Sequence, residues 1–588
     1  MKIKNIIYFA CALLLISCAD MFEPKNENVS VFDRVYKDPG FAEGVLVSAY
    51  TRIPTNSLSF NDVATDDAVT NDQDGSITTQ IVNYNNHRKM ATGEWSALFN
   101  PVNRWDNCNA AMIYLDQFIN IIDSVEWKWS NPEIRSLYQK RFKGEAYAMK
   151  GVIQYYLLES VAGYGESGQL LGIPFYKHAS DFNIPRATFH ESVNQIYSDF
   201  NKALEYLTMD DYKNISSASE LPPTYAGVNI DNYNDVFGKE LNQRISGRIV
   251  KAFKARLALL AASPAFASDP ALWADAAKYA GEVLETISGV PGLDPNGHKF
   301  YEAALVNAIN LGSGVDQKEI IWRRNITETN TRETDNFPPS LFGNGRVNPT
   351  QNLVDAFPMA NGYPIADQAS GYKGDTPYAS RDPRLGLYIV YNGSKYKGAD
   401  IYTGVGGKEN RRDSIPGKST RTGYYLKKLL REDVSLNPTG KTTAKHYEVH
   451  MRYTELFLIF AEAANEAWGP DGKGSFSFSA KDVIGAIRKR AGIVQPDNYL
   501  ASITSKEQMR ELIRNERRLE LCFEGSRFYD LRRWKANLTE PAKGVNIDGS
   551  KMDVVNVENR EYKDYMYYGP IPNSETTKFS ALEQNKGW

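Results

Sequence analysis

The densest group of side chains that could do chemistry lies near the C-terminus, from Asn515 to Lys535. This stretch reads NERRLELCFEGSRFYDLRRWK and holds five arginines, one lysine, four acids and four aromatic rings. Guanidinium groups bind carboxylates and phosphates through paired hydrogen bonds, so an active site, a phosphate grip and an ion-pair network all fit the composition. The interleaved acids argue against a phosphate grip. We therefore predict a partly buried network of ion pairs and stacked rings that belongs to the scaffold.

Two short patterns resemble metal sites. His446 and His450 stand four residues apart, which on a helix would suit zinc, but Glu448 is not where the HExxH motif places its base and the context predicts extended chain. The sequence TNDQDG at 70–75 resembles the start of a calcium loop, although Thr70 and Ile81 occupy positions that need acids. A surface turn is the favoured interpretation, with an irregular calcium site as the alternative. We predict no cofactor.

Motifs of known enzyme classes are absent. The GVGGKE sequence at 404–409 lacks the first glycine and the Ser/Thr of a phosphate loop, and no GxSxG elbow occurs. The chain has 71 acids, but no local pattern singles out a carboxylate pair for glycoside hydrolysis. We therefore predict no catalytic residue and a protein that is not an enzyme.

The bulk composition restricts the classes of partner. A chain of 588 residues has room for three to four ordinary domains or one large multilayer unit. The net charge of −3 excludes a global field that would attract nucleic acid. Four cysteines do not make a disulfide framework. We expect Cys522 to be a small buried hydrophobe, with a Cys108–Cys522 bridge as the minor alternative.

The N-terminus resembles an export signal. Two lysines precede an apolar run, Ile6 to Ile16, which is too short to span a membrane. The run ends in Leu15-Ile16-Ser17-Cys18, which resembles a bacterial lipobox. We predict a signal peptide at 1–17, lipidation of Cys18 and a flexible tether at 18–35, with an ordinary secretory signal as the alternative.

Helical periodicity dominates the remaining chain, and it predicts a mainly α fold. One helix should start at Pro132 and stop before Gly163, and another should be capped by Thr188 with Glu191 completing a capping box. Helix pairs rich in small residues resemble tetratricopeptide pairs. These small residues are Ala261, Ala262, Ala276 and Ala280. Two regions, about 51–95 and 295–450, are rich in turn residues and are expected to form long loops that carry binding residues.

The C-terminal stretch should itself be helical from near Ser505, with Gly525 ending the helix. Its arginines and acids then stand at spacings that allow pairing along the helix. The expected partners are Arg514, Arg517 and Arg518 with Glu511, Glu520 and Glu524.

Several segments resemble the RagB/SusD family of Bacteroidota outer-membrane lipoproteins, in family order. They include GEAYAMKGVIQYYLLESVAGYG, PTQNLVDAFPMANGYPI, RDPRL, RYTELFLIFAEAANE, NERRLELCFEGSRFYDLRRW and the closing PIP…QNKGW. The resemblance covers nearly the whole chain, lipobox included. It implies a tetratricopeptide-like helical scaffold supporting loops that carry short strands. It also implies one globular unit over 36–588, with an N-terminal half at about 36–230 and a C-terminal half at about 231–588.

The resemblance further implies a function. Members sit on the outer membrane, facing the cell exterior, as lids over a SusC-like TonB-dependent transporter. They capture glycans, or peptides in some branches, without catalysis. Only regional transfer of binding residues is justified. From the two loop regions we select candidates for ring stacking and for hydroxyl binding. These candidates are Asp66, Asp67, Tyr84, Trp95, Trp322, Arg323, Tyr372, Tyr378 and Tyr402.

Three alternatives to glycan capture stay open. They are oligopeptide capture, a surface glycoside hydrolase, and a purely structural subunit of the transporter. Trp95 and Trp322, the two predicted stacking platforms, could instead start a helix and fill the core, respectively. Which glycan is bound, whether of plant, host or microbial origin, does not follow from the sequence.

Overall fold

The computed structural model describes residues 37–54, 60–72, 79–176, 182–209, 213–266, 271–310 and 315–588. The predicted signal peptide, Cys18 and the tether lie outside these residues, as does much of the calcium-like loop.

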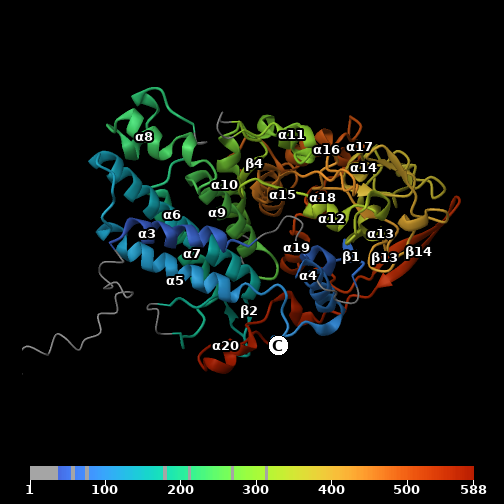
Figure 1. The fold of residues 1–588 in the computed structure, drawn as a ribbon, viewed down its shortest axis with the longest axis horizontal. Coiled ribbons are helices and arrows are strands. Elements are labelled where there is room, and N and C mark those ends of the chain that lie inside the picture. The colour runs from blue at the N-terminus through green and yellow to red at the C-terminus, as the bar shows by residue number, and fades with distance from the viewer. Residues whose placement is uncertain are drawn as a thin grey trace, which may run out of the picture.

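Long helices form one continuous array, which confirms the predicted mainly α, tetratricopeptide-like fold (Figure 1). Each helix of the array packs against the next, and α10 packs against both α9 and α15 although an insertion separates α10 from α15 in sequence. The helices of the array are α3 (Pro39–Thr51), α5 (Trp105–Ile121), α6 (Pro132–Val161), α7 (Phe189–Leu204), α9 (Gly247–Ala262), α10 (Ala271–Glu285), α15 (Tyr453–Trp468), α16 (Ala480–Ala491) and α18 (Lys506–Glu520). Helix α8 (Ile230–Phe237) packs on α6.

Local sequence accounts for several helix ends. Asn131 caps α6 through hydrogen bonds from the backbone of Glu133 and Ile134. The predicted capping box of Thr188 and Glu191 is present at the start of α7. Close packing also has a local cause, because a Cβ atom on Gly151 of α6 would lie 2.5 Å from the ring of Phe200 on α7. The four predicted small residues of α9 and α10 are all buried, and the two helices pack against each other.

The insertion between α10 and α15 holds short helices and two-stranded antiparallel ladders, as its turn-rich sequence predicts. The helices are α11 (Ala303–Asn307), α12 (Thr331–Asn336), α13 (Gln351–Ala356) and α14 (Arg384–Tyr388). Its strands are β4 (Ile320–Arg323), β5 (Thr327–Thr329), β6 (Val347–Pro349), β7 (Ile389–Val390), β8 (Ser394–Tyr396), β9 (Ala399–Ile401), β10 (Tyr425–Leu426), β11 (Ala444–His446) and β12 (Val449–Arg452). Strand β4 pairs with β12, β5 with β11, β7 with β10 and β8 with β9.

The N-terminal loop region joins this insertion. It contains β1 (Ala68–Thr70) and α4 (Thr79–Lys89), and β1 pairs with β6 in an antiparallel ladder. Residues 68–70 therefore lie beside residues 347–349, and the two loop-rich regions predicted from the sequence meet in space. A further small ladder joins β2 (Gly163–Tyr164) to β3 (Leu170–Leu171).

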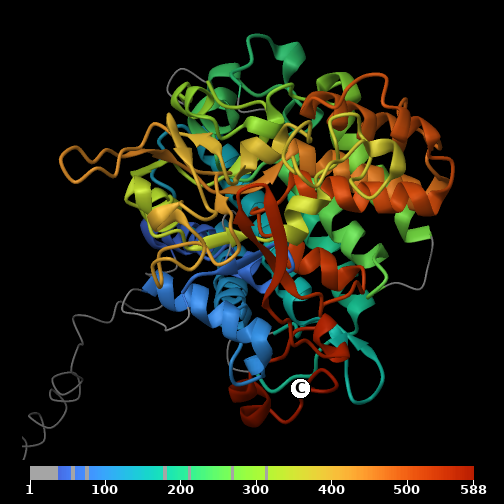
Figure 2. The ribbon, with the colours of Figure 1, turned by 90° about the vertical axis from the view of Figure 1, so that its right-hand side faces the viewer.

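The C-terminal stretch departs from its predicted helix. Helix α18 is capped by Ser505 but ends at Glu520, before the predicted stop at Gly525, and Phe523 adopts a left-handed φ of 62°. The physical reason is that Lys428 and Arg452 donate hydrogen bonds to the carbonyl of Glu520, which caps the helix end from outside. Helix α17 (Asn498–Ser502) precedes α18. After α18 come α19 (Arg527–Arg533), a hairpin of β13 (Ala542–Asp548) and β14 (Lys551–Glu558), and α20 (Asn573–Lys578). Figure 2 shows the hairpin along one face of the molecule.

One large apolar core runs through the helical array and a second lies beneath the loops. Cys108 belongs to the first core and Cys522 to the second. Both thiols are buried and unpaired, so the alternative of a bridge between them is wrong.

Candidate functional site

The arginines of the C-terminal stretch bind acids from distant segments. Arg518 lies 2.6 Å from Asp67 and 3.0 Å from Asp66, and Arg527 lies 2.8 Å from Asp66. Burial raises the pKa of Asp66, but the two guanidinium groups outweigh it and hold the pKa well below its usual range. These two carboxylates were predicted to bind sugar hydroxyls, and they are instead anchored to the scaffold.

The prediction that arginines and acids pair along the C-terminal helix was largely wrong. Only Arg514 approaches its expected partner, Glu511, at 3.7 Å. Arg517 instead binds Asp530 at 2.7 Å. Glu520, the last residue of the helix, accepts hydrogen bonds from Arg490 and Arg384. Glu524, four residues further on, accepts hydrogen bonds from Lys428 and Arg452. The network is tertiary, and the scaffold role predicted for the stretch fits it.

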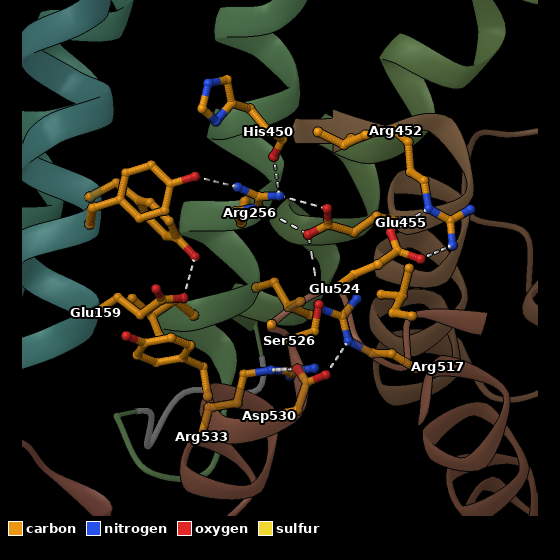
Figure 3. Close-up of a pocket in the computed structure, with 18 residues that line it drawn as sticks. Glu159, Arg256, His450, Arg452, Glu455, Arg517, Glu524, Ser526, Asp530 and Arg533 are labelled. Carbon is orange, nitrogen blue, oxygen red and sulfur yellow. Dashed lines mark hydrogen bonds and ion pairs between the residues drawn. The ribbon is translucent and has the colours of Figure 1, made fainter. Parts of the chain in front are cut away.

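A small pocket of about 50 Å³ lies within this network (Figure 3). Four arginines and four acids line it: Arg256, Arg452, Arg517 and Arg533 with Glu159, Glu455, Glu524 and Asp530. Arg256 lies 2.6 Å from Glu455, and Asp530 accepts from both Arg517 and Arg533 (Figure 3). The charges balance, and the space is large enough for water but too small for a sugar ring.

Two of the acids in this pocket, Glu524 and Asp530, are unsuited to act as an acid catalyst. Burial raises the pKa values of Glu524 and Asp530, but the adjacent basic groups outweigh burial and lower both. A glycoside hydrolase needs one carboxyl whose pKa is raised so that it keeps its proton at neutral pH. The pKa values of Glu524 and Asp530 are shifted in the opposite direction.

The predicted aromatic platforms are covered. Trp95 is 4% exposed and packs against Phe528, Tyr562 and Trp588, and its indole N–H donates to Asn100. It follows a single π-helical turn, Met90–Glu94, and does not start a helix. With its ring covered, Trp95 offers no face to a sugar in this structure.

Three further candidates, Trp322, Tyr84 and Arg323, are also buried. Trp322 is 2% exposed and donates its indole N–H to the carbonyl of Gln243. Tyr84 contacts the ring of Phe60 edge-on at 4.7 Å between centroids. Arg323 is held by Asp316 at 3.0 Å. An indole or phenol looks the same in sequence whether its apolar ring fills a core or faces solvent, which is why these positions were selected.

Three tyrosines lie nearer the surface. Tyr402 is 54% exposed, whereas Tyr372 and Tyr378 are half-buried. Tyr378 stacks on Tyr391 at 4.3 Å and shares a hydrogen bond with the Tyr424 hydroxyl, and Tyr372 covers the guanidinium of Arg381. Of the predicted residues, Tyr402 has the most accessible ring.

Tyr402 is one of four exposed apolar residues on the loops between residues 342 and 415, which we call together the loop surface: Phe342, Tyr402, Val405 and Ile415. Phe342 is 56% exposed and follows a turn whose Ser340 exchanges hydrogen bonds with Asn410 at 2.6 and 3.0 Å. These hydrogen bonds join the turn before Phe342, at Pro339–Leu341, to the turn at Lys408–Asn410. Phe342, Val405 and Ile415 were missed from sequence, although Phe342 stands between Gly, Pro and Asn residues that signal an exposed turn.

The first loop region adjoins these turns. The amide nitrogen of Asn71 donates to the carbonyl of Asn344, and the amide oxygen of Asn71 accepts from Arg346 at 3.3 Å. These hydrogen bonds connect the N-terminal loop region to the segment that follows Phe342.

A larger pocket of about 620 Å³ lies beside β4 and the first turn of α9. Trp322 forms part of its wall, together with amides and basic side chains. It is separate in the fold from the loop surface, and none of the predicted residues other than Trp322 lines it.

No cluster of three or more metal-ligating side chains occurs in the described part of the chain. His446 and His450 lie on strands β11 and β12, as their extended context predicted. Burial lowers the pKa of His450 to about 3, so its ring is neutral. Within the same described residues, no helix is both long enough and apolar enough to cross a membrane.

Comparison with known proteins identifies relatives. The model of the SusD family matches residues 318–588, and a family model described as starch-binding and associating with the outer membrane matches residues 45–226. SusD-like protein P2 of Formosa agariphila is 34% identical over 157 residues, which span 25% of this chain and 26% of that relative. The sequence match thus covers about a quarter of the length of this curated relative.

Solved structures show the same fold over most of the chain. A SusD-like protein from Bacteroides fragilis has a TM-score of 0.70 and 22% identity, covering 95% of this chain and 99% of that protein. A laminarin-binding SusD-like protein has a TM-score of 0.56 and 18% identity, covering 94% and 100%. The solved structures share the fold of this chain, and the two family models, which together match most of its length, show that it belongs to the SusD family.

Proposed function

We propose that this protein is a surface lipoprotein that captures glycan and passes it to a SusC-like TonB-dependent outer-membrane transporter, without catalysis. The observation that carries the proposal is the exposure of two aromatic rings, Phe342 and Tyr402, on the loops of a SusD-family chain. The outer-membrane association in the matching family description and the laminarin-binding neighbour support it. The lipid anchor is proposed at Cys18, from the lipobox.

The chemistry of the loop surface fits a sugar. A pyranose ring has an apolar C–H face that packs on an aromatic ring and hydroxyls that need polar partners. Tyr402 and Phe342 provide rings, and the same turns carry Asn344, Lys408 and Arg411. Such contacts need neither a nucleophile nor a raised carboxyl pKa, which agrees with the lowered pKa values of Glu524 and Asp530.

Calorimetry with a panel of oligosaccharides, laminarin fragments included, tests the binding site. Tyr402→Ala is expected to weaken binding of the cognate oligosaccharide by about tenfold, the loss of one stacking contact. Tyr114→Ala is the matched control, because Tyr114 is also an exposed tyrosine but lies on α5. Normal binding by Tyr402→Ala, or equal losses in both variants, would show that the loop surface is not the site.

Oligopeptide capture is the second candidate, since exposed aromatic and aliphatic side chains can also bind peptides. Titration with peptides under the same conditions separates the two ligand classes. Delivery is tested by purification from outer membranes, where the protein is expected to bring down a SusC-like barrel. Release of reducing ends from the panel would argue for a hydrolase instead.

A further inference from the structure

Strand β14 has a strand partner on one side only in the described part of the chain. It belongs to a ladder of two strands, and its partner is β13. In Figure 1 this hairpin lies at the right-hand end of the molecule, and in Figure 2, which is seen from that end, it stands in front. A free strand edge is a template on which another strand can pair, and most proteins cover or charge such an edge.

The hydrogen bonds of β13 show which backbone groups of β14 point outward. The N–H group of Val545 donates to the carbonyl of Thr422, and the carbonyl of Ile547 accepts from the N–H group of Val405, both at 2.8 Å. Val545 and Ile547 therefore direct their backbone groups away from β14. In an antiparallel ladder, the residue opposite such a position also directs its N–H and C=O groups away from its partner strand.

The free edge of β14 therefore presents the backbone groups of alternate residues. The register of the ladder gives three of them: Met552 opposite Ile547, Val554 opposite Val545, and Asn556 opposite Lys543.

The side chains at this edge leave it accessible. Val554 is 53% exposed, and Asn556 is exposed as well. Residues 554–557 read VVNV and contain neither a charge nor a proline, which are common means of protecting an edge strand. The charges of the strand's other end, Lys551 and Asp553, bind each other at 2.8 Å. The edge is thus open and weakly protected against strand pairing.

We infer that the free edge of β14 pairs with the same edge of a second copy of this chain, antiparallel, about a twofold axis at Val554. In this register Val554 lies opposite its own copy and Met552 lies opposite Asn556. Every outward-facing residue then meets another, and each such pair exchanges two hydrogen bonds. Asp553 lies opposite Val555, so no carboxylate faces another across the new pair.

Neighbouring registers fit less well. An axis at Asp553 would place two carboxylates directly opposite each other, which is destabilising. An axis at Val555 would place Met552 opposite Glu558, beyond the register shift that ends the regular part of the ladder. The strand is therefore complementary to itself in one register, which favours a second copy over an unrelated extended peptide as the occupant of the edge.

The pairing itself does not depend on the proposed function. It has a consequence that does. Val405 is bonded to the far side of β13, so the two copies of Val405 would lie about 25 Å apart across the four strands. A polymeric glycan of that length or more would contact the loop surfaces of both copies.

Disulfide trapping tests the pairing. The Cα atoms of a hydrogen-bonded antiparallel pair lie about 5.5 Å apart, within the range that a disulfide spans. Val554→Cys, in a chain that begins at residue 19 and retains every described residue, is expected to form a disulfide-linked dimer under mild oxidation. Val494→Cys is the matched control, because Val494 is 56% exposed and lies outside the hairpin. It should give about tenfold less dimer, since only the paired edge holds two thiols together.

Charge exchange at the axis tests the register. Val554→Lys and Val554→Glu each place two like charges opposite one another, so each variant alone is expected to sediment as a monomer. An equal mixture of the two variants is expected to recover the association of the wild type, because opposite charges then meet at the axis. Circular dichroism checks that both variants keep the fold, which their exposed position favours.

Three results would overturn the inference. They are equal cross-linking of Val554→Cys and Val494→Cys, a wild-type protein that stays monomeric in sedimentation at about 1 mM, and a mixture of the charged variants that stays monomeric. Protection of the Val554→Cys thiol by an added extended peptide, without dimer formation, would overturn it by assigning the edge to a peptide. No glycan enters these measurements, so their failure is distinct from failure of the proposed function.

Discussion

Single buried carboxylates differ in their charge state because their neighbours differ. Asp66 and Asp67 meet Arg518 and Arg527 across more than 400 residues of sequence, and the pairs tie the N-terminal loop region to the C-terminal stretch. Asp335 is half-buried, and the attraction of Arg346 does not compensate for its burial. Substitutions in the two environments are therefore expected to change the free energy of unfolding in opposite directions.

Removing the cation of the first pair should destabilise the fold. Arg518→Ala leaves Asp67 buried without its closest partner and should lower the free energy of unfolding by about 2 to 4 kcal/mol. Chemical denaturation measures this, and the double variant with Asp67→Asn should recover part of the loss. Ligand affinity of the folded single variant should equal that of the wild type. A stable Arg518→Ala protein that no longer binds would contradict the scaffold role.

Asp335 should destabilise the fold as pH rises. Burial raises its pKa from 3.8 to about 6, so the native state binds the proton more tightly than the unfolded chain does. Stability from this group is full below about pH 4 and is lost as pH rises through about 6. Asp335→Asn should therefore gain about 1 to 3 kcal/mol at pH 7.5 and nothing at pH 4. Unfolding curves at both pH values measure the gain, and equal gains at both would refute this titration.

Helices depend on small residues at their crossings. Gly151 allows α6 to approach Phe200 of α7, and a methyl group there would overlap the ring. Gly151→Ala should cost about 1 to 3 kcal/mol in the free energy of unfolding. Gly44→Ala in α3 is the matched control, since nothing lies within 4 Å of its added Cβ and alanine favours a helix. If Gly44→Ala also lowered the free energy of unfolding, or if Gly151→Ala left it unchanged, crowding between α6 and α7 would not be the cause.

At the scale of the whole molecule, the continuous helical array suggests that residues 36–588 unfold as one unit, which remains a prediction. Cys108 and Cys522 report on it, because they lie in the two different cores and burial raises the pKa of each thiol to about 12. Both should resist a thiol reagent in the folded state and react together at one denaturant concentration. Labelling of a chain beginning at residue 19, analysed by mass spectrometry, measures each thiol. Separate transitions would divide the protein into two units.

Features set by neighbouring residues could be predicted from the sequence. The capping box at Thr188 and the start of α6 at Pro132 follow from contacts within a few residues. The family was also recognisable, since its motifs are linear segments. The class of ligand is proposed on that basis.

Tertiary structure decided which polar and aromatic side chains are available to a ligand. The carboxylate of Asp66 could bind a sugar or an arginine. In the structure it binds Arg527, which is more than 400 residues away in the sequence. Trp95 could be a platform or a core residue, and Trp588 and Phe528 cover it. Helix α18 ends early because Lys428 and Arg452 reach its last carbonyl. Burial and pairing are properties of contacts between distant segments, and a linear pattern contains no record of them.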